Sequence, residues 1–285
     1  MHVQVNGVRL YIDVEGAGLV PDGPVMRRKP TLVLVHGGPG ADHSLYKPAF
    51  SALSDLCQIV YYDHRGCGRS EDGPRESWTL AQWGDDLKGL CDTLGIEKPV
   101  VLGTSFGGFV AQAYATRHPG HAGKLILVTT AAKVDFEQIY AAFARFGGEA
   151  AETAARDYWS NPSDATRAVY RKVCLPLYAV RGDKPDTSWM ARAITRNETG
   201  VHFNGPANEQ GRMDFRDALA SVDCPVLVMG GEEDPIMPIA FSETIAQSLP
   251  PDRVRFLRFP RCGHAIMPDD PEAALAAIRA FILDA

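Results

Sequence analysis

The sequence has no long hydrophobic run, and its amino-terminal ten residues carry neither a basic segment nor a continuous apolar stretch. A secretory signal needs both of these features, and a membrane-spanning helix needs about 20 apolar residues in succession. These absences argue against export and against membrane insertion. We therefore expect a cytoplasmic protein with no membrane partner.

Extended basic blocks are absent as well. The longest run of basic residues is Arg27-Arg28-Lys29, and the formal net charge of the 285 residues is −6. Binding to a phosphate backbone requires clustered lysine and arginine side chains, so nucleic acid is not an expected partner. The composition leaves a small molecule or a short peptide as the expected binding partner, and the oligomeric state stays open.

No Cys-x-x-Cys pair occurs among the six cysteines, which stand singly along the chain. A chain of this length buries a sizeable core without covalent cross-links, so we expect reduced thiols rather than a disulfide framework or a zinc site. No metal and no organic cofactor is expected. Whether Cys67 or Cys262 reacts with thiol reagents is left open by the sequence.

Alternating strand and helix patterns run through most of the chain. Residues 3–14 alternate around Asn6-Gly7, a pair typical of type I′ turns, and predict a hairpin followed by a loop rich in Gly, Pro and basic residues. Six short β-branched runs follow, at 31–36, 57–63, 99–104, 124–130, 225–230 and 254–259. Helical patterns separate them at 79–94, 106–118, 239–249 and 271–283. This order predicts an α/β fold with a mostly parallel eight-stranded sheet and helices on both faces.

One interval breaks this rhythm. Residues 132–217 contain helical patterns, no clear buried strand and 11 of the 25 aromatic residues. An insertion that leaves the carboxyl end of a strand lies where open α/β sheets bind ligands. We therefore predict a helical cap at 132–217 and a core formed by 1–131 and 218–285, with most cap aromatics in the cap's own core and a few facing a pocket.

Ser105 lies within Gly103-Thr-Ser-Phe-Gly107, directly after a predicted strand and directly before a predicted helix. A sharp strand-to-helix turn needs small neighbours, and it exposes the central hydroxyl at a helix amino terminus, which favours developing negative charge. The G-x-S-x-G pattern in this context predicts that Ser105 is a nucleophile. The same pattern also occurs by chance in glycine-rich turns, so partners are needed to support the assignment.

A serine nucleophile needs a base, and the base needs an orienting acid, in the chain order Ser, acid, His. His264 is the only histidine near the end of the chain, in the loop after the last predicted strand. Upstream, a loop after another predicted strand holds Glu232, Glu233 and Asp234. We predict Asp234 as the acid, because it precedes a proline and has the usual spacing after its strand, and we expect Glu232 and Glu233 to be solvated.

Acyl transfer also requires N–H donors for the tetrahedral oxyanion. One expected donor is the backbone N–H of Phe106, the residue after the nucleophile, and the second should come from the loop after the strand at 31–36. That loop reads His36-Gly-Gly-Pro-Gly40, and we assign the second donor to Gly38. His36 is expected to be structural.

The chain contains the segments HGGPG, DHRGCGRS at 63–70, GTSFGG, GEEDPIMP and GHAIMPDDP. With these segments it resembles the α/β-hydrolase superfamily. Within it, HGGPG resembles the proline iminopeptidase-like serine peptidases, although related esterases, lactonases and carbon–carbon bond hydrolases carry close variants. The resemblance covers essentially the whole chain apart from the cap. It implies a scaffolding role for the turn at 63–70, with Arg65 in an ion pair.

In that peptidase group a glutamate of the cap binds the free amino group of the substrate. The segment from Ala193 to Phe203 resembles the corresponding family segment, so the resemblance implies that Glu198 is this glutamate, as a buried carboxylate facing a cavity; a solvated glutamate is the alternative. Members of that group generally have a second acidic residue in the cap, directly after a tryptophan. In this sequence the residue after Trp159 is Ser160, so the second acid is missing. Glu198 and Trp159 are the predicted substrate-binding residues, and the missing acid puts peptide specificity in doubt.

These residues predict a serine hydrolase that forms an acyl-enzyme. The first expectation is a proline iminopeptidase-like aminopeptidase acting on small peptides or amino-acid amides. The alternative is an esterase or lactonase acting on a small neutral molecule. A ligand-binding member of the fold without turnover is the second alternative.

Overall fold

A central sheet of eight strands carries the fold in the computed structural model, which describes residues 1–180 and 191–284. The strand order is β1-β2-β6-β5-β7-β8-β9-β10. The bounds are β1 His2–Val5, β2 Val8–Glu15, β5 Thr31–Val35, β6 Gln58–Tyr62, β7 Val100–Thr104, β8 Lys124–Val128, β9 Val226–Gly231 and β10 Val254–Phe259. Within this sheet only the pairs β1–β2 and β2–β6 are antiparallel, so the predicted mostly parallel, eight-stranded sheet is confirmed.

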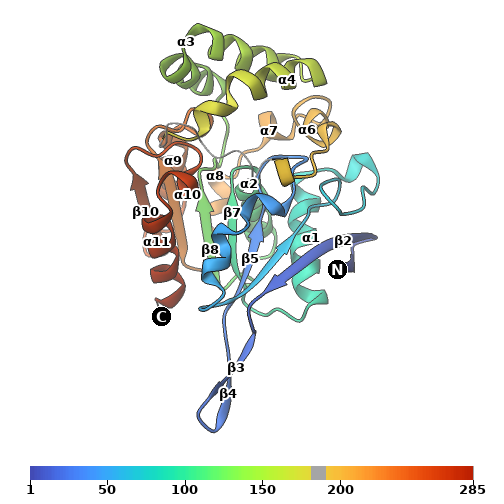
Figure 1. Cartoon of the computed structure of the whole chain (residues 1–285), viewed down its shortest axis with the longest axis vertical. Helices are drawn as coiled ribbons and strands as arrows, with labels where there is room; N and C mark the ends of the chain where they lie inside the picture. Colours follow the sequence, from blue (N-terminus) through green and yellow to red (C-terminus); the bar gives the residue numbers. More distant parts are fainter. Residues whose placement is uncertain (181–190, 285) are drawn as a thin grey trace.

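The amino-terminal hairpin is also as predicted. Asn6 and Gly7 have φ angles of 43° and 82°, the positive values that a type I′ turn requires at both central residues. The segment after it differs from the predicted loop. It forms a two-stranded antiparallel ribbon, β3 Leu19–Asp22 and β4 Val25–Arg28, which projects away from the body (Figure 1). Its sequence does not alternate between apolar and polar residues, because almost every side chain of the ribbon is exposed.

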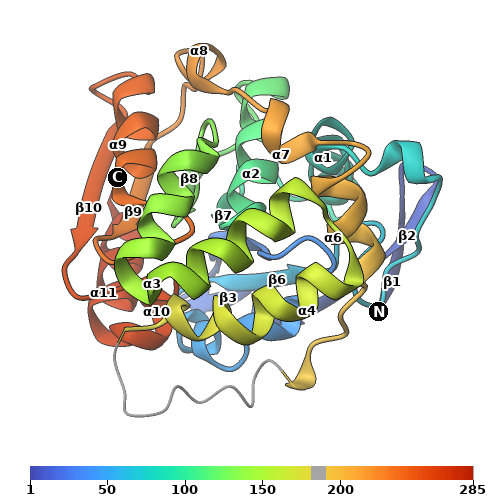
Figure 2. The ribbon, with the colours of Figure 1, turned by 90° about the horizontal axis from the view of Figure 1, so that it is seen from above.

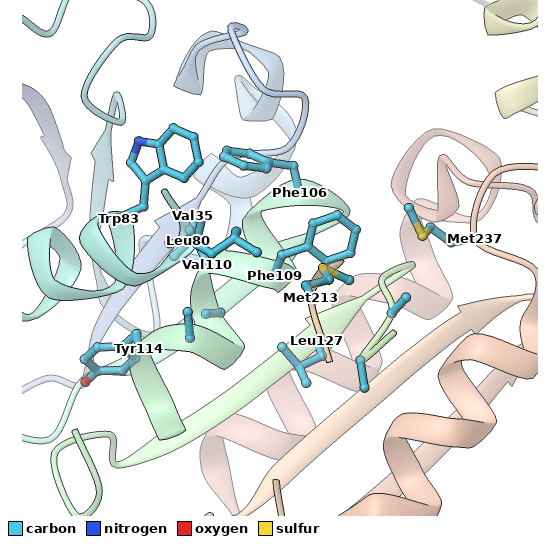
Figure 3. Close-up of a cluster of buried hydrophobic side chains, with 14 of the residues drawn as sticks. Val35, Leu80, Trp83, Phe106, Phe109, Val110, Tyr114, Leu127, Met213 and Met237 are labelled. Carbon is cyan, nitrogen blue, oxygen red and sulfur yellow. The ribbon is translucent and has the colours of Figure 1, made fainter. Parts of the chain in front are cut away.

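Two apolar cores lie on opposite faces of the sheet, because successive strand residues point to opposite sides. Val33 and Val35 of β5 belong to one core, whereas Leu32 and Leu34 belong to the other. The first core is covered by α1 Leu80–Thr93, α2 Phe106–Arg117 and α9 Ile239–Ser248. Figure 3 shows side chains that α1 and α2 contribute to it, among them Trp83 and Phe109. The second core is covered by α10 Ile266–Asp269, α11 Pro271–Leu283 and the 3-10 turns η1 His43–Tyr46 and η2 Ala49–Leu53. The prediction of helices on both faces is confirmed.

The segment predicted as a cap is mostly helical where the structure describes it. It contains α3 Phe136–Ser160, α4 Asp164–Val173, η4 Leu175–Tyr178, α6 Asn197–Asn204, α7 Glu209–Arg212 and the start of α8 Arg216–Leu219. Helices α3 and α4 lie over one edge of the sheet (Figures 1 and 2), the edge to which the parallel strands direct their carboxyl ends. The division into core and cap remains a prediction, and residues 181–190 of that segment lie outside the described residues.

Within the described residues, no helix combines the length and the apolar character that crossing a bilayer would demand. A short 3-10 turn, η3 Arg75–Ser77, precedes α1. Helix α1 begins after Thr79, whose side-chain oxygen accepts a hydrogen bond from the Gln82 N–H.

Candidate functional site

Ser105 lies between β7 and α2, at the carboxyl edge of the sheet. Its φ of 56° and ψ of −123° place a non-glycine residue in a strained backbone region. Hydrogen bonds hold this turn: the Ser105 N–H donates to the Val128 carbonyl at 3.0 Å, and the Ser105 carbonyl accepts from the Gly108 N–H and from the Thr130 hydroxyl, both at 2.8 Å. The predicted strand–Ser–helix geometry is therefore present.

The glycines around Ser105 are required by close packing. A Cβ on Gly103 would collide with the Gly107 carbonyl, and one on Gly107 would collide with the Val35 carbonyl. A Cβ on Gly108 would overlap the side chain of Thr130. Each glycine thus lets α2 start directly against the sheet, which brings its amino terminus and Ser105 to the same point.

Asp234 and His264 form a hydrogen-bonded pair at the same edge. His264 Nδ1 lies 2.8 Å from Asp234 Oδ2, and the two residues are 8% and 1% exposed. The other carboxylate oxygen of Asp234 accepts backbone N–H bonds from Ile236 at 2.9 Å and Met237 at 2.8 Å. Because these bonds fix the carboxylate, the imidazole is held with Nε2 turned away from Asp234.

Elements adjacent in the sheet bring these three residues to one edge. Thr104 pairs with Val128, and Val128 pairs with Met229, so the loops that follow β7, β8 and β9 leave the sheet side by side. The loop that holds His264 follows β10, which pairs with β9. As expected, Glu232 is exposed, and it lies 3.8 Å from an arginine on β10.

The loop after β5 lies against the nucleophile turn. A Cβ placed on Gly37 would approach the Ser105 Cβ to 3.4 Å. Gly38 has a φ of 65°, a conformation that glycine adopts without strain. Phe106 is the first residue of α2, where an N–H has no partner within the helix. The two predicted oxyanion donors thus belong to the two segments that lie next to Ser105.

Glu198 does not have the environment that the resemblance implied. Its side chain is 47% exposed, and Oε2 lies 2.6 Å from a guanidinium nitrogen of Arg75, whose side chain is 64% exposed. The expectation of a buried carboxylate is wrong at this position, because α6 directs Glu198 toward Arg75 on the surface. A glutamate already paired with an arginine is a poor partner for a substrate ammonium.

Trp159 belongs to an aromatic cluster formed by the helices over the sheet edge. Its ring lies 5.2 Å from that of Tyr170, and the Tyr170 hydroxyl lies 2.6 Å from the Tyr178 hydroxyl. The ring of Tyr178 in turn lies 4.8 Å from that of His264. Trp159 is therefore connected to the histidine through two tyrosines, and Tyr178 is the residue that makes the direct contact.

Three residues of this region were not expected from the sequence. Thr130 bonds to Ser105, Tyr178 packs against His264, and Arg196 bonds to the loop that carries Gly38 through the Gly40 carbonyl. Thr130 and Tyr178 lie in no recognised motif, and Arg196 lies in the segment from Ala193 to Phe203, whose resemblance pointed to Glu198 instead. Only the positions of the strands and of the cap segment bring them to the site.

The turn at 63–70 has the expected scaffolding geometry. Arg65 forms a bidentate ion pair with Asp86, at 2.6 and 2.8 Å, and both residues are buried. His36 is fully buried and accepts a bond from the His64 N–H at 3.2 Å, which agrees with a structural role. Burial raises the pKa of the Cys67 thiol to about 12, which keeps it protonated and slow to react.

The chain belongs to the α/β hydrolase fold family, whose model matches residues 30–271. A relative named "Putative carbamate hydrolase RutD", from Caulobacter sp. (strain K31), is 29% identical and covers 96% of this chain and 95% of its own length. The RutD of Escherichia coli O7:K1 is 26% identical over 85% of this chain and 87% of its own.

Solved structures give the same fold with several activities in their titles. A proline iminopeptidase from Mycobacterium smegmatis has a TM-score of 0.77 at 24% identity, over 99% and 97% of the two chains. An esterase from Exiguobacterium antarcticum has a TM-score of 0.74 at 18% identity, over 99% of both chains. An enol-lactonase from Burkholderia xenovorans LB400 has a TM-score of 0.67 at 23% identity, over 100% and 98%. At these identities the likeness shows the fold alone.

Proposed function

We propose that the protein is a serine hydrolase with Ser105 as nucleophile, His264 as general base and Asp234 as the acid that orients the imidazole. The observation that carries this proposal is the 2.8 Å bond between His264 Nδ1 and Asp234 Oδ2, with both residues buried. This bond leaves Nε2 of His264 as the nitrogen available to a serine hydroxyl. The strained turn at Ser105 supports the assignment, because nucleophile turns of this fold hold their serine in such a conformation.

The chemistry follows from these positions. His264 removes the hydroxyl proton as Ser105 attacks the substrate carbonyl, and the N–H groups of Phe106 and Gly38 stabilise the oxyanion that forms. The protonated imidazole is stabilised by Asp234 and gives its proton to the leaving group, which yields an acyl-enzyme. A water molecule deprotonated by His264 then releases the acyl group and regenerates Ser105.

A small neutral ester, lactone or carbamate is the substrate class that the site supports best. The pairing of Glu198 with Arg75 removes the carboxylate expected to bind an amine, and the cluster beside His264 is formed by aromatic side chains. The word carbamate in the name of the curated relatives supports including a carbamate among the candidate substrates. The HGGPG sequence at 36–40 favours a second candidate, an aminopeptidase that acts on small amides.

One comparison tests the mechanism and the substrate class together. We would measure hydrolysis of an aryl ester, an aryl carbamate, a γ-lactone, proline β-naphthylamide and its N-blocked form, with wild type, Ser105→Ala and Asp234→Asn. Labelling of each protein by a fluorophosphonate would report the reactive serine independently of substrate. We expect turnover of a neutral substrate, its abolition in Ser105→Ala, and a loss of kcat of about 10³–10⁴-fold in Asp234→Asn.

Each alternative gives a different result. Turnover of only the free proline amide would identify the aminopeptidase and contradict the neutral-substrate assignment. Labelling of wild type without turnover of any substrate would favour a ligand-binding protein with an intact triad. If the fluorophosphonate does not label wild type, or labels Ser105→Ala equally, Ser105 is not the nucleophile.

A further inference from the structure

One short segment of the cap region is fastened to the loop that carries Gly38. We call residues 194–199 the strap; it leads into α6. The N–H of Arg196 donates to the Gly40 carbonyl at 2.6 Å, and the N–H of Ile194 donates to Oδ2 of Asp42 at 3.0 Å. A Cβ on Gly40 would collide with the Arg196 carbonyl, so the strap and the loop are in direct backbone contact.

The side chain of Arg196 fixes the strap to the core. Its Nε donates to the Gly68 carbonyl at 3.0 Å, one terminal nitrogen donates to the Ser70 carbonyl at 3.1 Å, and the other pairs with Asp72. Only 27% of the side chain is exposed. A planar guanidinium with five N–H donors can reach these three acceptors together, whereas a lysine ammonium cannot reproduce the fork.

This attachment matters because of the loop that it holds. The loop contains three glycines, Gly37, Gly38 and Gly40, so its own sequence restricts its conformation little. An oxyanion donor, however, has to be placed within about 0.5 Å of its productive position to be effective. The loop has one internal bond, from the Ala41 N–H to the Gly38 carbonyl at 2.9 Å. The strap adds the bond to Gly40 from outside the loop, which restricts the position of Gly38.

We propose that Arg196 is a positioning residue for the oxyanion loop, residues 37–41, and that it holds the Gly38 N–H in place through the strap. The inference rests on the proposed function, since it assumes that Gly38 stabilises the oxyanion. The described bonds of Arg196 go to the loop and to the turn at 63–70 with its neighbour Asp72, and none goes to Ser105 or His264. Its effect is therefore expected in the transition state more than in substrate binding.

The test compares Arg196→Met with Arg156→Met. Arg156 is also an arginine of the cap segment; it pairs with Glu137 and Glu152, about 3.0 Å away, and bonds to no loop residue near Ser105 among the described contacts. The readouts are kcat, KM and the affinity of a trifluoromethyl ketone that forms a tetrahedral adduct with Ser105. Thermal unfolding reports on folding, and Arg196→Lys is the milder variant should Arg196→Met not fold.

We expect Arg196→Met to lower kcat and the affinity of the trifluoromethyl ketone by the same factor, about 10- to 100-fold, with KM within about twofold of wild type. Arg196→Lys should give an intermediate loss, and Arg156→Met should retain wild-type values. Unchanged kcat and ketone affinity in Arg196→Met, or a change confined to KM or to unfolding, would overturn the inference. Failure of wild type to label with a fluorophosphonate would instead refute the proposed function.

Discussion

At the scale of single residues, Ser105 combines strain with chemistry. Its backbone has a positive φ that an L side chain rarely adopts, and hydrogen bonds from Gly108 and Thr130 keep it there. A conformation of this kind costs about 1–3 kcal/mol, which the surrounding packing offsets. The hydroxyl is thereby presented beside the loop that carries Gly38, so the strain is part of the arrangement of the site.

This strain predicts the effect of Ser105→Gly on stability. Glycine adopts the observed backbone angles without the penalty, whereas Ser105→Ala removes the hydroxyl and keeps the strain. With the middle of the strain range, about 2 kcal/mol, and about 0.75 kcal/mol subtracted for the extra freedom of unfolded glycine, Ser105→Gly should be about 1 kcal/mol more stable than Ser105→Ala. Urea unfolding of the two inactive variants measures the difference, and equal stabilities would show that the turn stores no strain.

At the scale of elements, the parallel strands and the ribbon β3–β4 differ in how clearly the sequence predicts them. The strands follow from β-branched apolar runs, because a strand that is buried on both faces needs apolar side chains on both. The ribbon has no such signal, since its side chains are mostly exposed and its strands pair only with each other. It lies at the end of the molecule opposite to α3 and α4 (Figure 1).

We predict that the ribbon can be shortened with little effect. Replacing residues 20–27 by Asn-Gly keeps the pair Leu19–Arg28 and the bond from the Lys29 N–H to the Gly18 carbonyl, and it gives the two-residue hairpin a favourable turn. The free energy of unfolding should change by less than about 1 kcal/mol, and fluorophosphonate labelling should be unchanged. A loss of several kcal/mol in chemical unfolding would show that the ribbon supports the core.

At the scale of the whole molecule, buried histidines tie stability to pH. His36 and His64 are buried with ring centroids 4.2 Å apart, and desolvation lowers the pKa of both, that of His64 strongly. In the unfolded chain each titrates near pH 6.5. Below that pH the unfolded state therefore binds more protons than the folded state, and the free energy of unfolding falls as the pH falls.

The expected slope can be measured with His64→Phe, which keeps an aromatic ring and removes the titration. Above about pH 6.5 the contribution of His64 is constant, and below it the wild type should lose up to about 1.4 kcal/mol per pH unit from this residue. Urea unfolding at several pH values should give a shallower dependence for the variant between pH 6.5 and 4.5. Parallel curves for the two proteins would show that His64 titrates equally in both states.

The sequence by itself determined the sheet, its covering helices and the choice of Ser105, Asp234 and His264 as candidates. A strand that is buried on both faces requires an apolar run, and a tight strand-to-helix turn requires glycine. Both features can therefore be recognised in a short stretch of sequence. The tertiary structure places Ser105 at the start of α2 and hydrogen-bonds Asp234 to His264, as the proposed triad requires.

Only the tertiary structure decided where the partners from other parts of the chain lie. Glu198 matched a family segment in sequence, yet the orientation of α6 pairs it with Arg75 on the surface. The same segment gave no role to Arg196, yet the Arg196 N–H bonds to the loop that carries Gly38. Contacts between residues distant in the chain depend on how the elements pack, and a single sequence leaves no periodic signal of such packing.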